Sequence, residues 1–258
     1  MFDANCHPTL NGEWTDGRSG MTFEEMKQYL TSLNFTGACA VGISGVGGYN
    51  HEEFFKESIK HNGFYNPIAS VISENYQDLE NEFNEIIEIG YEAVKIHFRN
   101  SYIQNIDQYF QEIFRLASLN SINLYICTYT ASDISKNEIV TSNDLLKAVL
   151  QASKVEPNVK IVLAHGGVTS IMEYSLWVRH NKNILLDLSF TLQKYNNSSL
   201  ALDLNYLAEH MDERICFGSD LPDIKTNDFE ESLGFFSKIS EPKKENIYTK
   251  NIKKFLML

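Results

Sequence analysis

The segment 215–219 reads Ile-Cys-Phe-Gly-Ser and ends directly before an acid, Asp220, with Pro222 two residues further on. Its composition is typical of a short buried β-strand. If it is the last strand of a parallel barrel, Asp220 lies at the carboxyl ends of the strands, where such barrels carry their catalytic groups. A carboxylate there can act as a general base toward water. The alternative is that Asp220 only caps the turn or helix that follows, a common place for aspartate.

Basic side chains end other predicted strands in the same way. His7, His97, Arg99 and His165 each stand at or near the carboxyl end of an apolar segment. These ends open at one face of a parallel barrel, so we expect the four side chains to converge with Asp220. A single histidine of this kind is often satisfied by a backbone carbonyl, whereas the whole set favours a catalytic site. The remaining histidines, His51, His61, His180 and His210, fall on predicted helices or their ends and are expected to be solvated.

The stretch 90–99 carries a row of three basic residues. Lys95, His97 and Arg99 alternate with the apolar residues Val94, Ile96 and Phe98. In a barrel strand the apolar row faces the helices, which leaves the basic row facing the interior and the mouth. The planar fork of an arginine pairs well with a carboxylate, so this row predicts binding of an anionic substrate. A solvated surface position for Arg99 is the alternative.

The elements that must position these residues alternate between strands and helices along the chain. Predicted strands cover 2–6, 36–43, 64–72, 90–99, 122–128, 159–165, 184–189 and 215–219. Mostly helical segments separate them, and the first helix opens at Thr22 with a capping box completed by Glu25. This rhythm implies a parallel sheet. A closed (β/α)8 TIM barrel is the simplest solution, and a doubly wound open sheet is the alternative.

Composition narrows the class of partner. The chain has 258 residues, which suits one barrel domain over 1–258, and no linker or charge block interrupts it. Its net charge is −12 and its isoelectric point is near 5.0, which argues against binding to nucleic acid or to an anionic membrane surface. We therefore expect a small-molecule substrate. A chain this short is also compatible with a homodimer.

Cysteine usage and the absence of an apolar span predict a cytoplasmic protein. Cys6, Cys39, Cys127 and Cys216 show no C-x-x-C spacing, and each falls in a predicted strand, so they are expected to be small buried apolar residues. Reduced thiols fit the cytoplasm. No apolar run reaches the roughly 18 residues needed to span a bilayer, and the first residues lack the pattern of a signal peptide.

Four stretches together resemble a known family. They are Phe-Asp-Ala-Asn-Cys-His at 2–7, Gly-Tyr-Glu-Ala-Val-Lys-Ile-His at 90–97, Ile-Val-Leu-Ala-His-Gly-Gly at 161–167 and Ile-Cys-Phe-Gly-Ser-Asp-Leu-Pro at 215–222. In this order they resemble the amidohydrolase-related (amidohydrolase 2) group of the amidohydrolase superfamily. The resemblance implies a (β/α)8 barrel that hydrolyses C–N or C–O bonds or decarboxylates its substrate. It also implies one divalent metal ion, held by a His-x-His pair from strand one, a histidine from strand five and the aspartate after strand eight.

Carried onto this chain, the resemblance gives a degenerate metal site. His7 and Asp220 match two ligands, and Asp220 also handles the proton of the attacking water, while His165 matches the histidine that assists the substrate. Asn5 stands where the first histidine of the pair is expected, so it can offer only an amide oxygen. At strand five the chain has Thr128 or, one residue earlier, Cys127, and strand parity allows only one of them to point inward.

Three hypotheses follow. The first is a hydrolase that keeps one zinc or manganese ion, with Asp220 as general base and His165 stabilising the oxyanion. The second is a metal-free hydrolase, lactonase or lyase in which Asp220 activates water directly and the basic residues stabilise negative charge. The third is a barrel that has lost catalysis and only binds a ligand.

Overall fold

The computed structural model describes residues 1–98, 103, 105–130 and 141–258. Eight parallel strands form one sheet in sequence order. They are β1 (Phe2–Cys6), β2 (Gly37–Val41), β3 (Tyr65–Ser70), β4 (Ala93–Ile96), β5 (Asn123–Cys127), β6 (Ile161–Ala164), β7 (Ile184–Asp187) and β8 (Ile215–Cys216). Backbone hydrogen bonds join the segment after β8 to β1 and the residue that follows it, from Ala4 N to Phe217 O at 3.0 Å, from Asp220 N to Asn5 O at 2.8 Å and from His7 N to Leu221 O at 2.8 Å. The predicted (β/α)8 barrel is confirmed, and the open-sheet alternative is wrong.

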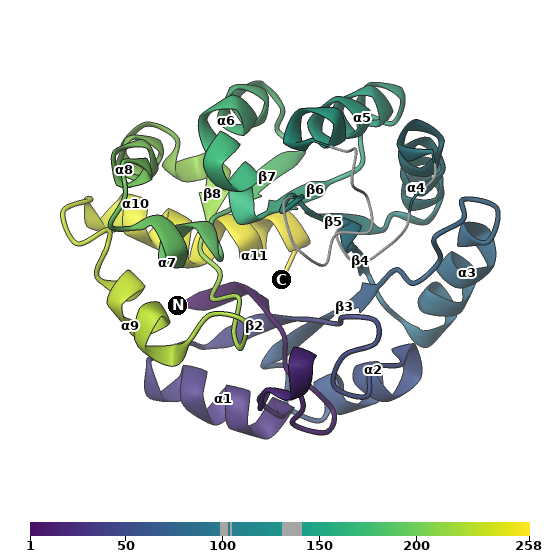
Figure 1. Cartoon of the computed structure of the whole chain (residues 1–258), viewed down its shortest axis with the longest axis horizontal. Coiled ribbons are helices and arrows are strands. Elements are labelled where there is room, and N and C mark those ends of the chain that lie inside the picture. The colour runs from purple at the N-terminus through teal and green to yellow at the C-terminus, as the bar shows by residue number, and fades with distance from the viewer. Residues whose placement is uncertain (99–102, 104, 131–140) are drawn as a thin grey trace.

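Helices surround the strands (Figure 1). They are α1 (Phe23–Ser32), α2 (His51–Ile59), α3 (Leu79–Ile89), α4 (Ile106–Asn120), α5 (Ser142–Val155), α6 (Ile171–His180), α7 (Thr191–Tyr195), α8 (Leu200–His210), α9 (Thr226–Leu233), α10 (Glu241–Glu245) and α11 (Asn251–Leu256). The predicted capping box is confirmed, because the Thr22 hydroxyl accepts from Glu25 N and the Glu25 carboxylate accepts from Thr22 N. None of the helices in the described part of the chain is long and apolar enough to cross a bilayer.

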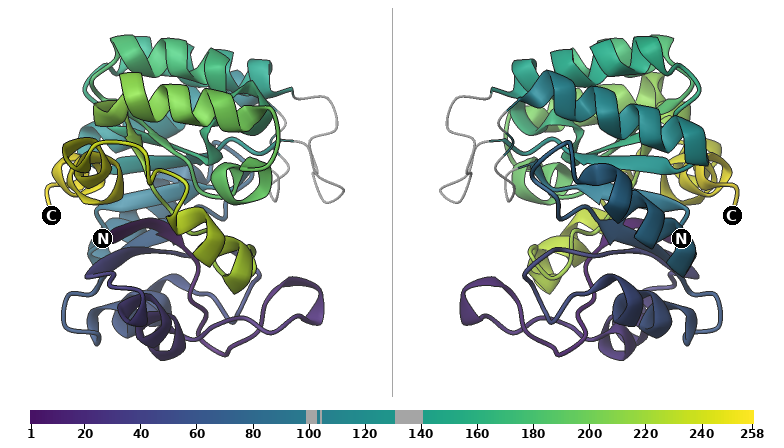
Figure 2. Two further views of the ribbon diagram at one scale, coloured as in Figure 1. Left: turned by 90° about the vertical axis from the view of Figure 1, so that its left-hand side faces the viewer. Right: turned by 90° about the vertical axis from the view of Figure 1, so that its right-hand side faces the viewer.

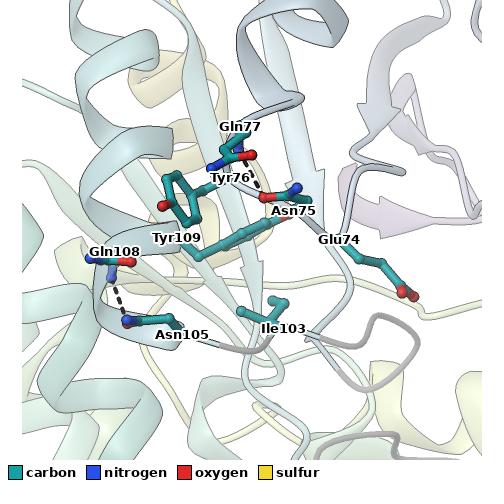
Figure 3. A pocket seen from close by; sticks show the side chains of 8 residues that line it. All are labelled: Glu74, Asn75, Tyr76, Gln77, Ile103, Asn105, Gln108 and Tyr109. Carbon is teal, nitrogen blue, oxygen red and sulfur yellow. Dashed lines mark hydrogen bonds between the residues drawn. The ribbon is translucent and has the colours of Figure 1, made fainter.

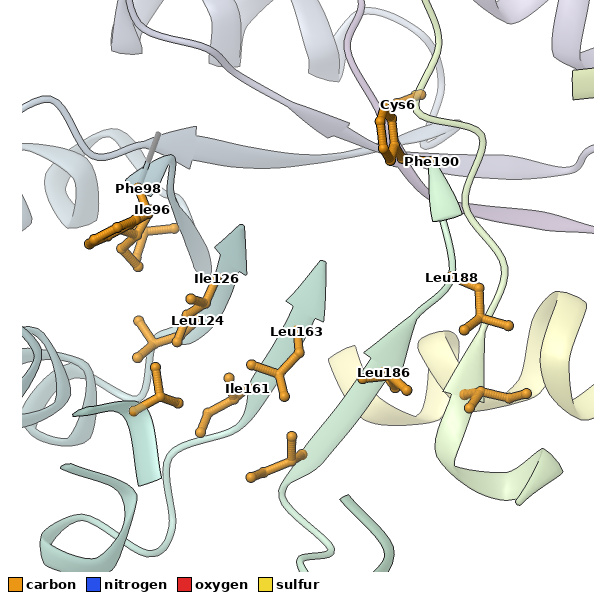
Figure 4. Close-up of a cluster of buried hydrophobic side chains, with 14 of the residues drawn as sticks. Cys6, Ile96, Phe98, Leu124, Ile126, Ile161, Leu163, Leu186, Leu188 and Phe190 are labelled. Atoms are coloured by element: carbon orange, nitrogen blue, oxygen red, sulfur yellow. The ribbon is translucent and has the colours of Figure 1, made fainter. Parts of the chain in front are cut away.

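The main apolar core lies between the strands and the helices. Val94, Ile96 and Phe98 belong to it, so the apolar row of the fourth strand faces the helices as predicted. Figure 4 shows side chains of β4 to β7 gathered in this core. The alternate residues of β4 therefore point into the barrel, and Lys95 is fully buried there.

A second apolar cluster fills the barrel interior. Phe2 and Ala4 of β1 join interior residues of the other strands and Ile252, Phe255 and Leu256 of α11. In the side views, α11 lies at one end of the barrel and the loop 8–21, in dark purple, lies at the opposite end (Figure 2). The C-terminal helix thus closes the end of the barrel away from the carboxyl ends of the strands.

The structure differs from the sequence-based predictions in several places. A register shift between Asp3 and Cys6 interrupts the alternation of side-chain directions along β1. Ala4 therefore joins the barrel interior, while Cys6 packs on the helix side. His51 and His61 are buried, not solvated, since their rings pack against aromatic residues and lie near glutamates. The prediction for the cysteines is confirmed, because all four lie in the described part of the chain, are buried and form no disulfide bond.

Candidate active site

Asp220 lies where the barrel closes. Its side chain is 5% exposed, and its Oδ1 lies 3.0 Å from Asn5 Nδ2, 3.3 Å from His7 Nε2 and 3.9 Å from His165 Nδ1. The next helix, α9, begins at Thr226 with Lys225 as its N-cap, so Asp220 is not a helix cap. The carboxylate instead faces groups from β1 and β6.

Asp220 and two residues near it stand on strained backbone. His165, Phe190 and Asp220 follow β6, β7 and β8, and their φ values are 67°, 64° and 57°. Left-handed backbone at a residue other than glycine costs roughly 1–3 kcal/mol each, and such strain gathers at functional sites. The Phe190 ring packs edge-on against His165 with 5.8 Å between the ring centroids. The strain thus presents both His165 and Asp220 at one place.

His7 is held by its backbone-facing nitrogen. Nδ1 lies 2.8 Å from Val41 O, and because a carbonyl can only accept, this nitrogen carries the proton. Nε2, 3.3 Å from Asp220 Oδ1, can therefore donate to this carboxylate only when the imidazole carries a second proton. Burial, followed by the positive charge of Lys95, lowers the pKa of His7, which Asp220 only partly offsets. His97 lies beside it, with 5.9 Å between the ring centroids.

His165 is oriented by two groups of Ser189. Its Nδ1 lies 3.2 Å from the Ser189 carbonyl oxygen and 3.2 Å from the hydroxyl oxygen. The Ser189 hydroxyl donates to Asp187 Oδ2 at 2.5 Å, and it accepts from Asn5 Nδ2 at 2.8 Å. Asp187 thus fixes Ser189, and Ser189 fixes the imidazole.

Asn5 links a cation to an anion. The buried Lys95 ammonium donates to Asn5 Oδ1 at 3.0 Å, while Asn5 Nδ2 donates to Asp220 Oδ1 at 3.0 Å. Lys95 was predicted to bind substrate, and it lies in the same network as Asp220. Arg99, predicted for the same role, lies outside the described residues.

The surrounding charges keep Asp220 ionised. Burial acts to raise the pKa of Asp220, but the charge of His165, the contact with His7 and the charge of Lys95 hold that pKa well below its usual range. Burial would lower the pKa of His165, yet Asp220 and Cys127 raise it above its usual value. The two groups stabilise each other's charged forms.

Two further acids lie in the barrel and were not predicted as site residues. Burial raises the pKa of Asp3 to about 7, and burial also raises the pKa of Asp187. Asp3 Oδ1 accepts from Asn5 N at 3.0 Å and from Ser219 N at 2.9 Å, which ties β1 to the segment after β8. An acid within a strand of mostly apolar residues was the available signal for both.

At strand five the structure separates Cys127 from Thr128. The Thr128 hydroxyl donates to Ala164 O at 2.6 Å and accepts from Gly167 N at 2.7 Å, so it supports the backbone on both sides of His165. Cys127 is buried and acts on the pKa of His165, which places it toward the site. The Thr128 hydroxyl is thus engaged with the backbone and does not take the place of the histidine ligand.

The donors present do not fit the metal centre that the resemblance implies. His7 and Asp220 suit a divalent ion, since metal-binding histidines commonly donate their other nitrogen to a carbonyl. Asn5 does not, because its oxygen accepts from Lys95 and its NH2 group faces Asp220. An ion sharing that oxygen would lie within about 5 Å of the ammonium, where repulsion at an effective dielectric constant near 20 is about 7 kcal/mol. Among the described residues, no group of three or more His, Cys, Asp or Glu side chains could hold a metal.

The loop 8–21 covers His7. The rings of Trp14 and His7 lie 5.8 Å apart, and Trp14 Nε1 donates to Asp223 Oδ1 at 3.4 Å. Arg18 Nη2 lies 3.2 Å from the same oxygen. Asp223 belongs to the segment after β8, so this loop and that segment shelter the site from solvent together.

A polar cavity of about 720 Å³ lies between the connections that follow β3 and β4 (Figure 3). It is lined by Glu74, Asn75, Tyr76, Gln77, Ile103, Asn105, Gln108 and Tyr109. These connections lie at the same end of the barrel as Asp220. Of the predicted site residues that the structure describes, none lines this cavity.

Comparisons with solved structures match the fold. An uncharacterised TIM-barrel protein from Bordetella bronchiseptica is similar with a TM-score of 0.79 and 15% identity, over 100% of this chain and 99% of that one. A putative amidohydrolase from Staphylococcus aureus has a TM-score of 0.66 and 14% identity over 100% of both chains. Dihydroorotase from Campylobacter jejuni has a TM-score of 0.66 and 15% identity, over 100% of this chain and 83% of that one. No protein-family model and no curated protein matches the chain.

Proposed function

We propose that this chain is an amidohydrolase-like hydrolase that cleaves a C–N or C–O bond in a small anionic molecule. The observation that carries the proposal is the buried Asp220 carboxyl group, 3.3 Å from His7 and 3.9 Å from His165 at the carboxyl ends of the strands. Asp220 caps no helix, and its carboxyl lies beside both histidines at the end where such barrels carry their catalytic groups. The putative amidohydrolase and dihydroorotase of the same fold agree with this chemistry.

In the proposed reaction, Asp220 takes a proton from a water molecule as the water oxygen forms a bond to the substrate carbonyl carbon. The carbonyl oxygen gains a negative charge, which the His165 imidazolium stabilises. When the C–N or C–O bond breaks, Asp220 returns its proton to the leaving nitrogen or oxygen. No step is routed through a metal ion, since the donor set does not fit one.

The charge balance of the site favours an anionic substrate. Lys95 is a cation and His165 has a raised pKa, while Asp220 is the acid with a lowered pKa. The raised pKa values of Asp3 and Asp187 favour their neutral forms. A carboxylate on the substrate would complete the balance near Lys95 or His97.

The test is a screen for turnover of carboxylate-bearing amides, esters and lactones with the wild type and with Asp220→Asn. We expect kcat to fall about 10²–10⁴-fold in the variant, as for loss of a general base. Asp228→Asn on α9 is the matched control and should keep full activity. Turnover retained by Asp220→Asn would overturn the role of Asp220. If the wild type turns over none of the compounds, and Asp220→Asn binds one of them as tightly as the wild type does, the result would favour the ligand-binding barrel.

A further inference from the structure

Lys95 lies in the part of the site where the resemblance expects a divalent ion. Its side chain is fully buried, and its ammonium donates to the oxygen of Asn5, the residue that occupies the first ligand position. A buried ammonium needs an acceptor and a nearby opposite charge. Asn5 provides the acceptor, and Asp220, one hydrogen bond further on, provides the charge.

The orientation of the Asn5 amide is fixed by its three partners. Its oxygen faces the Lys95 ammonium, and its NH2 group faces Ser189 Oγ at 2.8 Å and Asp220 Oδ1 at 3.0 Å. Rotating the amide by half a turn would place NH2 against an ammonium and oxygen against a carboxylate. Both contacts would be repulsive, so Asn5 cannot turn its oxygen toward an ion bound by Asp220.

We propose that the Lys95 ammonium takes the place of the divalent ion in this centre and orients Asp220 through Asn5. Its single positive charge, transmitted through the amide, lies opposite the carboxylate that a metal would otherwise neutralise. The centre is therefore complete without metal, and chelators leave the reaction unchanged. This inference rests on the proposed function for the reaction in which Asp220 takes part, whereas the place of Lys95 rests on the contacts described above.

The test measures bound metal and does not need a substrate. Four proteins are purified without an affinity metal: the wild type, Asn5→His, Lys95→Met and the double variant Asn5→His/Lys95→Met. Each is equilibrated with Zn²⁺ or Mn²⁺, desalted and analysed for elemental content, and its melting temperature is recorded with and without metal. Methionine keeps most of the apolar length of lysine but removes the charge.

We expect near-stoichiometric metal only in the double variant, where a His-x-His pair and Asp220 meet no competing ammonium. The wild type and Asn5→His should stay free of metal, and neither Zn²⁺ nor a chelator should move their melting temperatures. Stoichiometric metal in the wild type would overturn the proposal. So would metal bound as tightly by Asn5→His as by the double variant, and so would a folded double variant that binds none.

The wild-type measurement keeps the proposal testable if a variant fails to fold, which circular dichroism would show. It also separates the two ideas. Absence of turnover with every compound screened would count against the proposed function and leave the metal result standing. Activity of the wild type that is abolished by a chelator would count against the role of Lys95 and leave hydrolysis standing.

Discussion

The missing side chain at Gly218 lets two parts of the site approach each other. A Cβ atom at this position would lie 2.7 Å from Asp187 Oδ1 and 3.1 Å from Asn5 Cβ. These contacts are too short, and both neighbours are buried and hydrogen-bonded. The sequence therefore needs glycine here for close packing rather than for turn geometry.

We predict that Gly218→Ala destabilises the protein by about 1–3 kcal/mol, the usual range for overpacking a buried site. Urea denaturation gives the free energy of unfolding. Gly234→Ala is the matched control, because the nearest atom to its added Cβ lies 3.9 Å away. Equal stability of the two variants would show that Asn5 and Asp187 can yield without loss.

At the same scale, the type and place of several site residues could be predicted from sequence. His7, His165 and Asp220 were expected to meet because they end strands, and they do. The Asn5 bridge could not be predicted from the sequence. Asn5 contacts Lys95, which lies 90 positions away, and Asp220, which lies 215 positions away, and the orientation of its amide depends on three partners. The register shift in β1 also disturbs the alternation from which such contacts would be inferred.

Among the elements, α3 is tied to the strand before it by one buried acid. Glu82 accepts from Ile72 N at 2.6 Å and from Ser73 N at 2.9 Å, and it lies 3.4 Å from His51 Nε2. The backbone after β3 thus obtains the hydrogen bonds that a buried connection requires. This connection leads directly to the polar cavity.

We predict that Glu82→Gln lowers the free energy of unfolding by about 1–3 kcal/mol, because hydrogen bonds to a charged group are lost. Burial acts to raise the pKa of Glu82, but His51 and the backbone N–H groups lower it below its usual value of 4.5. The contribution of this acid is therefore present above pH 4.5 and is lost as the pH falls through the lowered pKa.

Unfolding curves recorded from neutral to acidic pH check this prediction. The difference between the wild type and Glu82→Gln should shrink at acidic pH. Glu88→Gln, an exposed position on the same helix, should match the wild type throughout. A difference that stays constant with pH would contradict the role of the charge.

Element positions followed well from the sequence, because apolar periodicity and caps are local signals. The strand β1 has the predicted bounds, and α1 begins directly after the predicted N-cap, Thr22. The five-residue helix α7 was not predicted, since so short a segment has no periodicity to detect. The burial of His51 was missed because its partner Glu82 lies on another helix.

For the molecule as a whole, α11 acts as a plug. Ile252, Phe255 and Leu256 pack against the first residues of β1 at the end of the barrel away from the site. The barrel interior would otherwise open to water there. This helix therefore stabilises the fold without contacting the catalytic groups.

We predict that Ile252→Ala costs about 2–5 kcal/mol of stability, as for other truncations of buried aliphatic residues. Lys254→Ala, an exposed position on the same helix, should cost little. The free energy of unfolding in urea measures both. Under native conditions Ile252→Ala should keep the metal content and the activity of the wild type. A variant that loses activity but no stability would contradict the structural role of α11.

The joining of β1 to the segment after β8 also sets when the site can exist. His7 and Asp220 are 213 residues apart in the chain. At a synthesis rate of roughly 5–20 residues per second, Asp220 is therefore added about 10–40 s after His7. Until then Asn5 and His7 lack the carboxylate that they face in the finished protein. A ribosome-bound chain that stops before residue 220 should therefore have no working site, however much of the barrel has already formed.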